Sequence, residues 1–377
     1  MIPFNKPYLT GNETKYIHDA HSRGQLAGDG YYTKLCHAWL EDFTGASKAL
    51  LTHSCTAALE IAALLLDIKP GDEVIMPSYT FVSTANAFVL RGATPIFVDI
   101  SPSDLNIDYL QIEQAISSKT KAIVVVHYAG VACDMDAIKN IAEMNSLFLV
   151  EDAAQGLMAF HHSNPLGSIG DIGCFSFHET KNIICGEGGA IVVNNKELAS
   201  RAEILREKGT NRSSFFRGEV DKYTWVDIGS SYLPGELNAA FLYAQLQSAH
   251  AITTQRLQIW LTYHDYFSHS EWGKFGLLTP SPPSEFRHNG HIYYLLFPSR
   301  LLRDKFIAMM QAEGVHTVFH YIPLHNSPAG LIYSSAHGTL PVTESVAQTL
   351  VRLPIYLDLD VDCVISKVDK VLSCLFL

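Results

Sequence analysis

Lys181 stands where a lysine could act as a nucleophile. It follows the apolar run 173–177 and precedes the glycine-rich segment 186–189. Glycine allows backbone to approach a ligand closely. A lysine held there would lose hydration, which lowers its pKa and frees the amine to attack a carbonyl. Because most lysines are solvated surface residues, this segment alone does not identify an active site.

A second candidate is Asp152, at the end of the apolar run 147–150. Glu151, Asp152 and then Gln155 follow that run directly. A buried aspartate is costly unless it has a cationic partner. The protonated ring nitrogen of a pyridoxal-phosphate (PLP) cofactor would be such a partner, and that ring needs its proton to withdraw electrons. Helix capping by Asp152 explains the segment equally well.

Two further segments place polar or aromatic groups after strands. Ser54, Cys55 and Thr56 precede a long helical segment, and hydroxyl and free N–H groups at a helix start can bind a phosphate. An ordinary helix cap has the same pattern. Phe81 follows another strand and could stack on a flat ring or belong to the core. Together the four segments describe one site with a phosphate cradle, a stacking aromatic residue, an acid and a lysine.

A mostly parallel sheet must position these groups. Apolar runs with helical segments between them are typical of strands that are covered on both faces. Functional residues should then gather at the carboxyl ends of the strands. The predicted strands are 48–52, 73–77, 94–99, 121–126 and 147–150, and the first long helix is 56–67.

The alternation ends near residue 248. A long helical pattern covers 244–260, and a smaller α/β unit follows, with a strand at 292–297, a helix at 304–313 and a closing helix after Asp362. The sequence therefore predicts a large domain over 1–248 and a small C-terminal domain over 249–377.

Composition and charge exclude several classes of function. The formal net charge of −11 argues against a nucleic-acid groove binder, because phosphate contacts need a basic surface. The seven cysteines are scattered, without any Cys-x-x-Cys, which fits a reducing cytoplasm and no metal site. No signal peptide is visible, and the longest apolar helical run, 57–68, is too short to span a bilayer. We expect a cytoplasmic protein without membrane or nucleic-acid partners.

The same segments resemble the DegT/DnrJ/EryC1/StrS family of sugar aminotransferases. The signature consists of Glu151-Asp152-Ala153-Ala154-Gln155, then 175–177, then Lys181, then 186–189, and the likeness covers essentially the whole chain. It implies an α/β fold of PLP type I, like aspartate aminotransferase, with a mostly parallel central sheet in a large domain and a smaller C-terminal α/β domain. It also implies a homodimer and a PLP cofactor.

The resemblance implies roles for individual residues. Lys181 would be the Schiff-base lysine and the proton carrier, Asp152 would pair with the ring nitrogen, and Gln155 would lie near the ring hydroxyl. The remaining cofactor contacts would be Phe81 on the ring and Cys55, Thr56 and Ser176 on the phosphate.

The resemblance also implies substrate contacts. Gly28, Asp29 and Gly30 match a loop near the sugar. The segment 320–325 matches a loop at the mouth of the site, and a structural role for His320 and His325 is the alternative.

One segment departs from the family pattern. Many relatives carry an asparagine before a Tyr-Arg pair that reaches the partner's cofactor phosphate. Here Ser231 stands at the asparagine position and can still donate a hydrogen bond, but Leu233 replaces the arginine. This weakens the case for a phosphate contact across subunits.

Three stretches favour one substrate. Segments 77–87, 127–132 and 207–213 resemble members that convert dTDP-4-keto-6-deoxy-D-glucose and L-glutamate to dTDP-4-amino-4,6-dideoxy-D-galactose and 2-oxoglutarate, for enterobacterial common antigen or O-antigen. Amination at C3 or formation of the 4-amino gluco epimer are the alternatives within the family.

Other classes fit less well. A Rossmann oxidoreductase should show Gly-x-Gly-x-x-Gly and usually Tyr-x-x-x-Lys, and the chain has neither. The family's dehydratase branch replaces the lysine by histidine, which Lys181 contradicts. An inactive regulator would not need Asp152, Gln155 and Lys181 together.

A polar loop after the catalytic segment is the densest cationic run. It contains Lys208, Arg212, Arg217 and Lys222. Arginine matches phosphate oxygens in a bidentate way, so Arg212 and Arg217 are the predicted contacts to the diphosphate of the dTDP-sugar. A solvated loop without a specific partner is the alternative.

Overall fold

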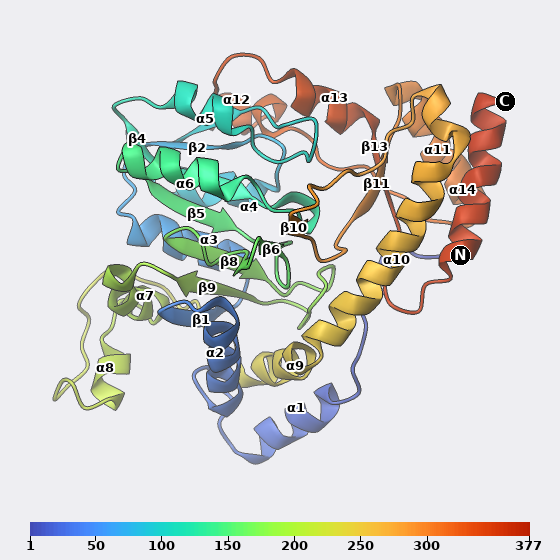
Figure 1. The fold of residues 1–377 in the computed structure, drawn as a ribbon. Coiled ribbons are helices and arrows are strands. Elements are labelled where there is room, and N and C mark those ends of the chain that lie inside the picture. Colours follow the sequence, from blue (N-terminus) through green and yellow to red (C-terminus); the bar gives the residue numbers. More distant parts are fainter.

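An eight-stranded sheet forms the centre of the computed structural model, which describes residues 1–377 (Figure 1). β9 runs antiparallel to its neighbours β1 and β8, and the other neighbouring strands are parallel. The prediction of a mostly parallel sheet is therefore confirmed. In spatial order the strands are β1 (Lys48–Thr52), β9 (Gly189–Val193), β8 (Ile172–Ser176), β5 (Phe148–Asp152), β4 (Thr120–Val126), β2 (Glu73–Pro77), β3 (Thr94–Val98) and β12 (Ser335–Ala336).

The central strands have mostly apolar residues because helices cover both faces of the sheet. In β4, Ala122 and Val124 belong to one core cluster, whereas Ile123 and Val125 belong to another. Successive side chains of a strand point to opposite faces, so both sets are buried. The helices of this large unit are α1 (Glu13–Ser22), α2 (Tyr31–Thr44), α3 (Cys55–Leu65), α4 (Val82–Val89), α5 (Tyr109–Ala115), α6 (Met135–Met144), α7 (Ala199–Arg206), α8 (Arg212–Phe216) and α9 (Glu236–Gln247).

The helical pattern around 244–260 consists of two helices. α9 ends at Gln247, and α10 (Ala249–His269) begins after a break at Ser248. The buried side chain of Gln245 donates hydrogen bonds to the Tyr8 carbonyl and to the carboxylate of Glu13, which ties α9 to the N-terminal segment. α10 instead packs in the C-terminal core, so the chain must turn between the two helices (Figure 1).

The C-terminal unit has a core of its own. β11 (Tyr293–Leu296) and β13 (Leu350–Leu353) pair antiparallel. Near the N-terminus, Ile2 forms a parallel bridge with Val315, so the start of the chain lies against the C-terminal unit (Figure 1). The helices of this unit that follow α10 are α11 (Arg300–Ala312), α12 (Gly330–Tyr333), α13 (Pro341–Thr349) and α14 (Val361–Phe376).

The segment 324–340 of the C-terminal part packs against the large sheet. β12 pairs with β3 at the sheet edge, and Leu324 and Leu340 pack in the core of the large unit. The division at residue 248 stays a prediction. A small third sheet consists of β10 (Phe286–Arg287), β6 (Phe160–His161) and β7 (Asn164–Pro165). None of the helices combines the length and apolar character needed to cross a bilayer.

Candidate active site

A cavity of about 640 Å³ lies at the carboxyl ends of the strands, between the sheet and the C-terminal unit. Asp152 at the end of β5 and Ser176 at the end of β8 line it from the sheet. Arg352 of β13 lines it from the C-terminal unit. Open α/β sheets bind ligands at this edge.

Most predicted cofactor residues meet in this cavity. The structure brings them together from the start of α3, the residue before α4, and the ends of β5 and β8 with the segments that follow them, and places His320 there as well. Ser231 does not line it. The roles of these residues stay predictions. The cofactor residues that line the cavity are Cys55, Thr56, Phe81, Asp152, Gln155, Ser176 and Lys181.

Asp152 is a buried carboxylate that is held by neutral donors only. Thr84 Oγ1 donates to its Oδ2 at 2.7 Å, and the Ala154 N–H donates to its Oδ1 at 3.1 Å. Burial raises the pKa of Asp152, although these hydrogen bonds and the charge of Lys181 act in the opposite direction. A protonated ring nitrogen would supply the cation that the carboxylate lacks.

Lys181 ends the turn 178–181, which follows β8. Its N–H donates to the His178 carbonyl at 2.9 Å, and the residue lines the cavity. Burial lowers the pKa of Lys181, the charge of Arg352 lowers it further, and Asp152 and Cys55 oppose the shift. A larger neutral fraction makes this amine a better nucleophile and base.

The start of α3 lines the cavity with Ser54, Cys55 and Thr56. The Ser54 side chain caps the helix by accepting from the Ala57 N–H at 3.1 Å. The first N–H groups of a helix have no intrahelical partners and attract anions. Thr56 Oγ1 lies 2.7 Å from Ser83 Oγ, so the two hydroxyls are oriented together.

Gly189 is required by the close approach to this helix start. A Cβ atom at Gly189 would lie 2.3 Å from the Ser54 carbonyl carbon and 2.4 Å from the Cys55 nitrogen. Only glycine can therefore bring the turn after Lys181 against the cradle. An acid, a lysine and an anion cradle in one cavity fit a PLP molecule.

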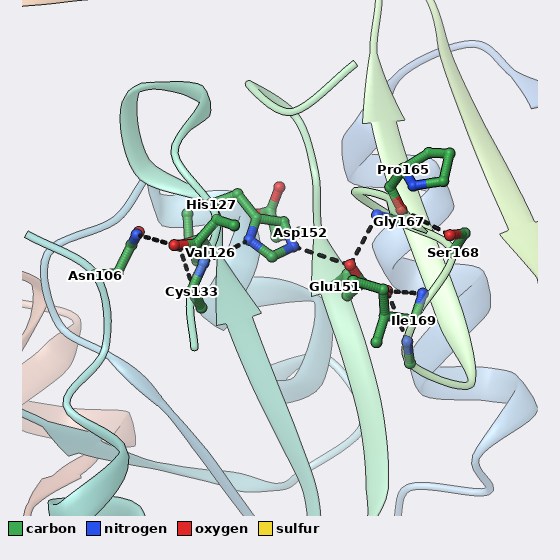
Figure 2. A network of polar contacts seen from close by, with 12 residues as sticks. Asn106, Val126, His127, Cys133, Glu151, Asp152, Pro165, Gly167, Ser168 and Ile169 are labelled. Carbon is green, nitrogen blue, oxygen red and sulfur yellow. Dashed lines mark hydrogen bonds and ion pairs between the residues drawn. The ribbon is translucent and has the colours of Figure 1, made fainter. Parts of the chain in front are cut away.

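Glu151, the neighbour of Asp152 in β5, binds the backbone of the turn 167–170 (Figure 2). Its carboxylate lies 2.9 Å from His127 Nε2 and accepts the N–H groups of Gly167, Ile169 and Gly170 at 2.6 to 2.7 Å. Burial opposes ionisation, but these contacts outweigh it and lower the pKa of Glu151. Glu151 therefore acts on the turn 167–170, on the opposite face of the strand from Asp152.

The predicted sugar loop and Ser231 lie together, outside this cavity. Asp29 forms an ion pair with Arg206, and a Cβ atom at Gly28 would lie 2.7 Å from the Pro234 carbonyl oxygen. Ser231 forms a bridge with Glu207. Within one chain these residues do not reach the cofactor residues, and their roles stay predictions.

The two predicted diphosphate arginines are also outside the cavity. Arg212 contacts Glu207 at 3.3 Å and covers the Phe216 ring at 4.9 Å. Arg217 contacts Glu203 at 2.9 Å and Glu219 at 2.7 Å. Both guanidinium groups therefore have carboxylate partners within the chain.

Two predicted residues, Gln155 and His320, form hydrogen bonds with tyrosines around the cavity, and the sequence analysis missed several other cavity residues. Gln155 accepts from the Ala129 N–H at 2.7 Å and donates to Tyr321 Oη at 3.1 Å. His320 Nδ1 lies 3.1 Å from Tyr128 Oη, and burial lowers the pKa of this imidazole well below its usual value. Among the missed residues, Arg352 could have been noticed in the sequence, because it is a single charged residue in an otherwise apolar strand. The other lining residues without a predicted role include Ser83, His291, Arg256 and Tyr321.

One cluster outside the cavity bears on the prediction of no metal. Asp136, His161 and His162 place possible ligand atoms within 4.8 Å of one another. The absence of a metal therefore stays a prediction.

Comparisons with known proteins identify the family. The sequence matches the DegT/DnrJ/EryC1/StrS aminotransferase family over residues 7–373. It is 33% identical to the spore coat polysaccharide biosynthesis protein SpsC of Bacillus subtilis, with 99% of this chain and 97% of SpsC covered. The aminotransferase TlmJ of Streptoalloteichus hindustanus superposes with a TM-score of 0.91 at 30% identity, over 100% of both chains.

A further neighbour carries information on the cofactor. Spr1654 of Streptococcus pneumoniae, solved in a PLP form and a PMP form, is 26% identical, and its PMP form superposes with a TM-score of 0.92 over 100% of both chains. These findings confirm the predicted fold class, enzyme class and cofactor. The chain belongs to the DegT/DnrJ/EryC1/StrS aminotransferase family and is a PLP-dependent aminotransferase with the type I fold.

Proposed function

We propose that the chain transfers the amino group of L-glutamate to the keto carbon of dTDP-4-keto-6-deoxy-D-glucose. The products are dTDP-4-amino-4,6-dideoxy-D-galactose and 2-oxoglutarate. The observation that carries the proposal is the buried pair of Lys181 and Asp152 in one cavity with the start of α3. The name of SpsC and the description of Spr1654 as a sugar aminotransferase support a sugar substrate.

Each residue of the cavity would have a separate role in the reaction. PLP, when bound, withdraws electrons from the substrate carbon next to the nitrogen. Asp152 would hold the proton on the ring nitrogen by its charge. The Lys181 amine would move a proton to and from that carbon. Phe81 would pack on the ring.

The phosphate would be bound at the start of α3. Cys55 and Thr56 offer backbone N–H groups there, and Ser176 offers a hydroxyl from the end of β8. A helix N-terminus stabilises negative charge, so this arrangement would fix the cofactor without a basic residue.

Product identification tests the proposal. Incubation with dTDP-4-keto-6-deoxy-D-glucose and glutamate should give a product whose proton NMR spectrum shows an axial amine at C4. An equatorial C4 amine would indicate the gluco epimer. A product aminated at C3 after incubation with the 3-keto isomer, and none at C4, would overturn the assignment of the reacting carbon.

The cellular setting is part of the same proposal. The aminosugar would serve cell-surface polysaccharide synthesis, either enterobacterial common antigen or O-antigen. All seven cysteines are free thiols, which supports a reducing cytoplasm. The active form would be a homodimer, the commonest symmetric assembly.

A further inference from the structure

The hairpin 160–165 places two neighbouring histidine rings side by side. β6 and β7 pair antiparallel with His161 opposite Asn164, so His162 stands in the loop between the two strands. Successive side chains of a strand normally point to opposite sides. Here the φ angle of His162 is 53°, in the left-handed region, and the two imidazole rings lie together with their centroids 4.4 Å apart. Both rings can therefore contact one bound ion.

Asp136 brings a carboxylate to the same place from another element. It lies in the first turn of α6, and its Oδ2 is 3.4 Å from Nε2 of His162. The ligand atoms of Asp136, His161 and His162 all lie within 4.8 Å of one another. Two ligands that are about 2.1 Å from a tetrahedral zinc ion lie about 3.4 Å apart. The carboxylate and the His162 ring therefore already have the separation that such an ion requires.

His161 is the fixed member of this group. Its side chain is buried, and its ring packs on that of Phe286 in β10 with the centroids 4.5 Å apart. Buried polar side chains are normally hydrogen-bonded, but the ring of His161 makes no hydrogen bond within the chain. The nearby His127 is also buried and uses both ring nitrogens, toward Glu151 and the Cys133 N–H. A metal ion beside the two exposed side chains would supply the partner that His161 lacks.

Two imidazole nitrogens and a carboxylate oxygen favour zinc over other common ions. Zinc takes nitrogen and oxygen ligands in a tetrahedral arrangement, and three protein ligands leave the fourth position to water. Calcium and magnesium ions instead take oxygen ligands. The side chains of Asp136 and His162 are 77% and 50% exposed, which gives the ion a path from solvent and leaves room for the water.

The cluster is separate from the active-site cavity, because none of its three residues lines that cavity. It joins two segments of the large unit that lie on either side of β5 in the sequence. α6 precedes this strand, and the hairpin 160–165 follows it. An ion held by both segments would therefore link the chain before and after Asp152.

We propose that Asp136, His161 and His162 bind one zinc ion, with a water molecule as the fourth ligand. The ion stabilises the folded chain by linking α6 to the hairpin 160–165, and it takes no part in the transfer of the amino group. The proposal does not rest on the proposed function. The sequence predicted no metal because its cysteines form no zinc motif, whereas these ligands are histidines and an aspartate from two distant segments.

Zinc titration of the PLP-loaded enzyme tests the proposal, after treatment with EDTA and desalting. Isothermal titration at about pH 7.5, where most imidazoles are neutral, should show one zinc ion per wild-type chain. Asp136→Asn and His162→Asn should each raise the Kd about 10-fold or more, because each removes one ligand. Asparagine suits position 162, since it tolerates a positive φ. His269→Ala is the matched control, because His269 is an exposed histidine beside Asp265 without a third ligand.

Two further measurements separate a bound ion from a change in the fold or in the cavity. Zinc should raise the melting temperature of the wild type and of His269→Ala, because it binds the folded chain, and should leave that of both site variants unchanged. The glutamate half-reaction of the zinc-free enzyme should run at the wild-type rate in both site variants, since neither Asp136 nor His162 lines the cavity.

Three results would overturn the proposal. Equal zinc affinity in the wild type and both site variants would place the bound ion elsewhere. Absence of wild-type binding at about 1 mM zinc would exclude the site. A loss of affinity in His269→Ala as large as that in the site variants would indicate unspecific binding to surface histidines. A wild type that binds zinc as expected but aminates no sugar would contradict the proposed function only.

Discussion

Two adjacent carboxylates end β5, and their different surroundings follow from strand geometry. Glu151 and Asp152 point to opposite faces of the sheet. Glu151 meets three backbone N–H groups and His127, whereas Asp152 faces the cavity. The order of residues placed Asp152 at the sheet edge, since an apolar strand that ends in polar residues places them there, but it did not decide between a cofactor contact and a helix cap. The partners of Glu151 come from the turn 167–170, and no local pattern reveals them.

Replacement of Lys181 tests the central assignment. Lys181→Ala should reduce turnover by about 1,000-fold or more, because the amine is needed for both bond exchange with the cofactor and proton transfer. Circular dichroism should be unchanged. Lys34→Ala, an exposed lysine of α2, provides the control. A Lys181→Ala enzyme with near-normal turnover would refute the role of this residue.

Asp152 should be needed for rate more than for cofactor retention. Asp152→Asn keeps the shape and the Thr84 contact but cannot hold a ring proton by charge. We expect the glutamate half-reaction to slow about 100-fold with the PLP content preserved. Stopped-flow absorbance measures the rate. Equal rates in the two proteins would show that Asp152 is not the partner of the ring nitrogen.

At the scale of elements, the sequence predicted those helix and strand ends that depend on neighbouring residues in the chain. The strands at 48–52 and 73–77 were predicted at their observed ends, because continuous apolar runs stop at polar residues or proline. The break at Ser248 was missed, since both flanking segments are helical and only the tertiary contacts of Gln245 separate them. β12 was also missed, because two residues that pair at a sheet edge have no periodicity to detect.

The end of β5 and the turn 167–170 should behave as one acid-sensitive element. Glu151→Gln replaces an acceptor by a group whose amide faces other N–H donors, and should lower the free energy of unfolding by about 3 kcal/mol at pH 7. The folded-state pKa of Glu151 lies below 4.5, so the wild type has this stabilisation above that pH and loses it as the pH falls further.

The measurement is urea unfolding at pH 7 and at pH 4, followed by tryptophan fluorescence. The difference between wild type and Glu151→Gln should shrink in acid. Glu143→Gln, an exposed position on α6, should show no difference at either pH. A Glu151→Gln protein as stable as the wild type at pH 7 would contradict the assignment.

At the scale of the whole molecule, the cavity is built by two units and by distant segments. Phe4, Lys181 and Arg352 reach it from the start, middle and end of the chain. The sequence predicted the residues on the sheet edge, where topology brings strand ends together. It did not predict Arg352, Tyr321 or His291, because their place depends on how the C-terminal unit packs on the sheet.

The predicted site residues outside the cavity lie near exposed apolar side chains. Trp225 is 79% exposed, and Tyr223, Val226, Ile228 and Leu237 near it in sequence are exposed as well. Exposed apolar side chains in such number are typical of an interaction surface. Asp29, Arg212, Arg217 and Ser231 belong to the same loops or to loops beside them. We therefore expect these loops to serve the partner's cavity in a two-fold dimer.

Mixing two impaired variants tests that arrangement. One variant is Lys181→Ala, and the other is Arg212→Ala with Arg217→Ala, which should raise the KM for the dTDP-sugar and leave the glutamate half-reaction nearly unchanged. If the loop acts on the partner, a mixed dimer has one complete site, formed by an intact Lys181 and the loop of the other chain. Random exchange makes half of the dimers mixed, each with one active site of two, so activity at low sugar concentration should recover to about a quarter of wild type. Sedimentation confirms the dimer. No recovery after exchange, with the loop variant impaired, would show that the loop acts within its own chain, and an active monomer would exclude the shared site.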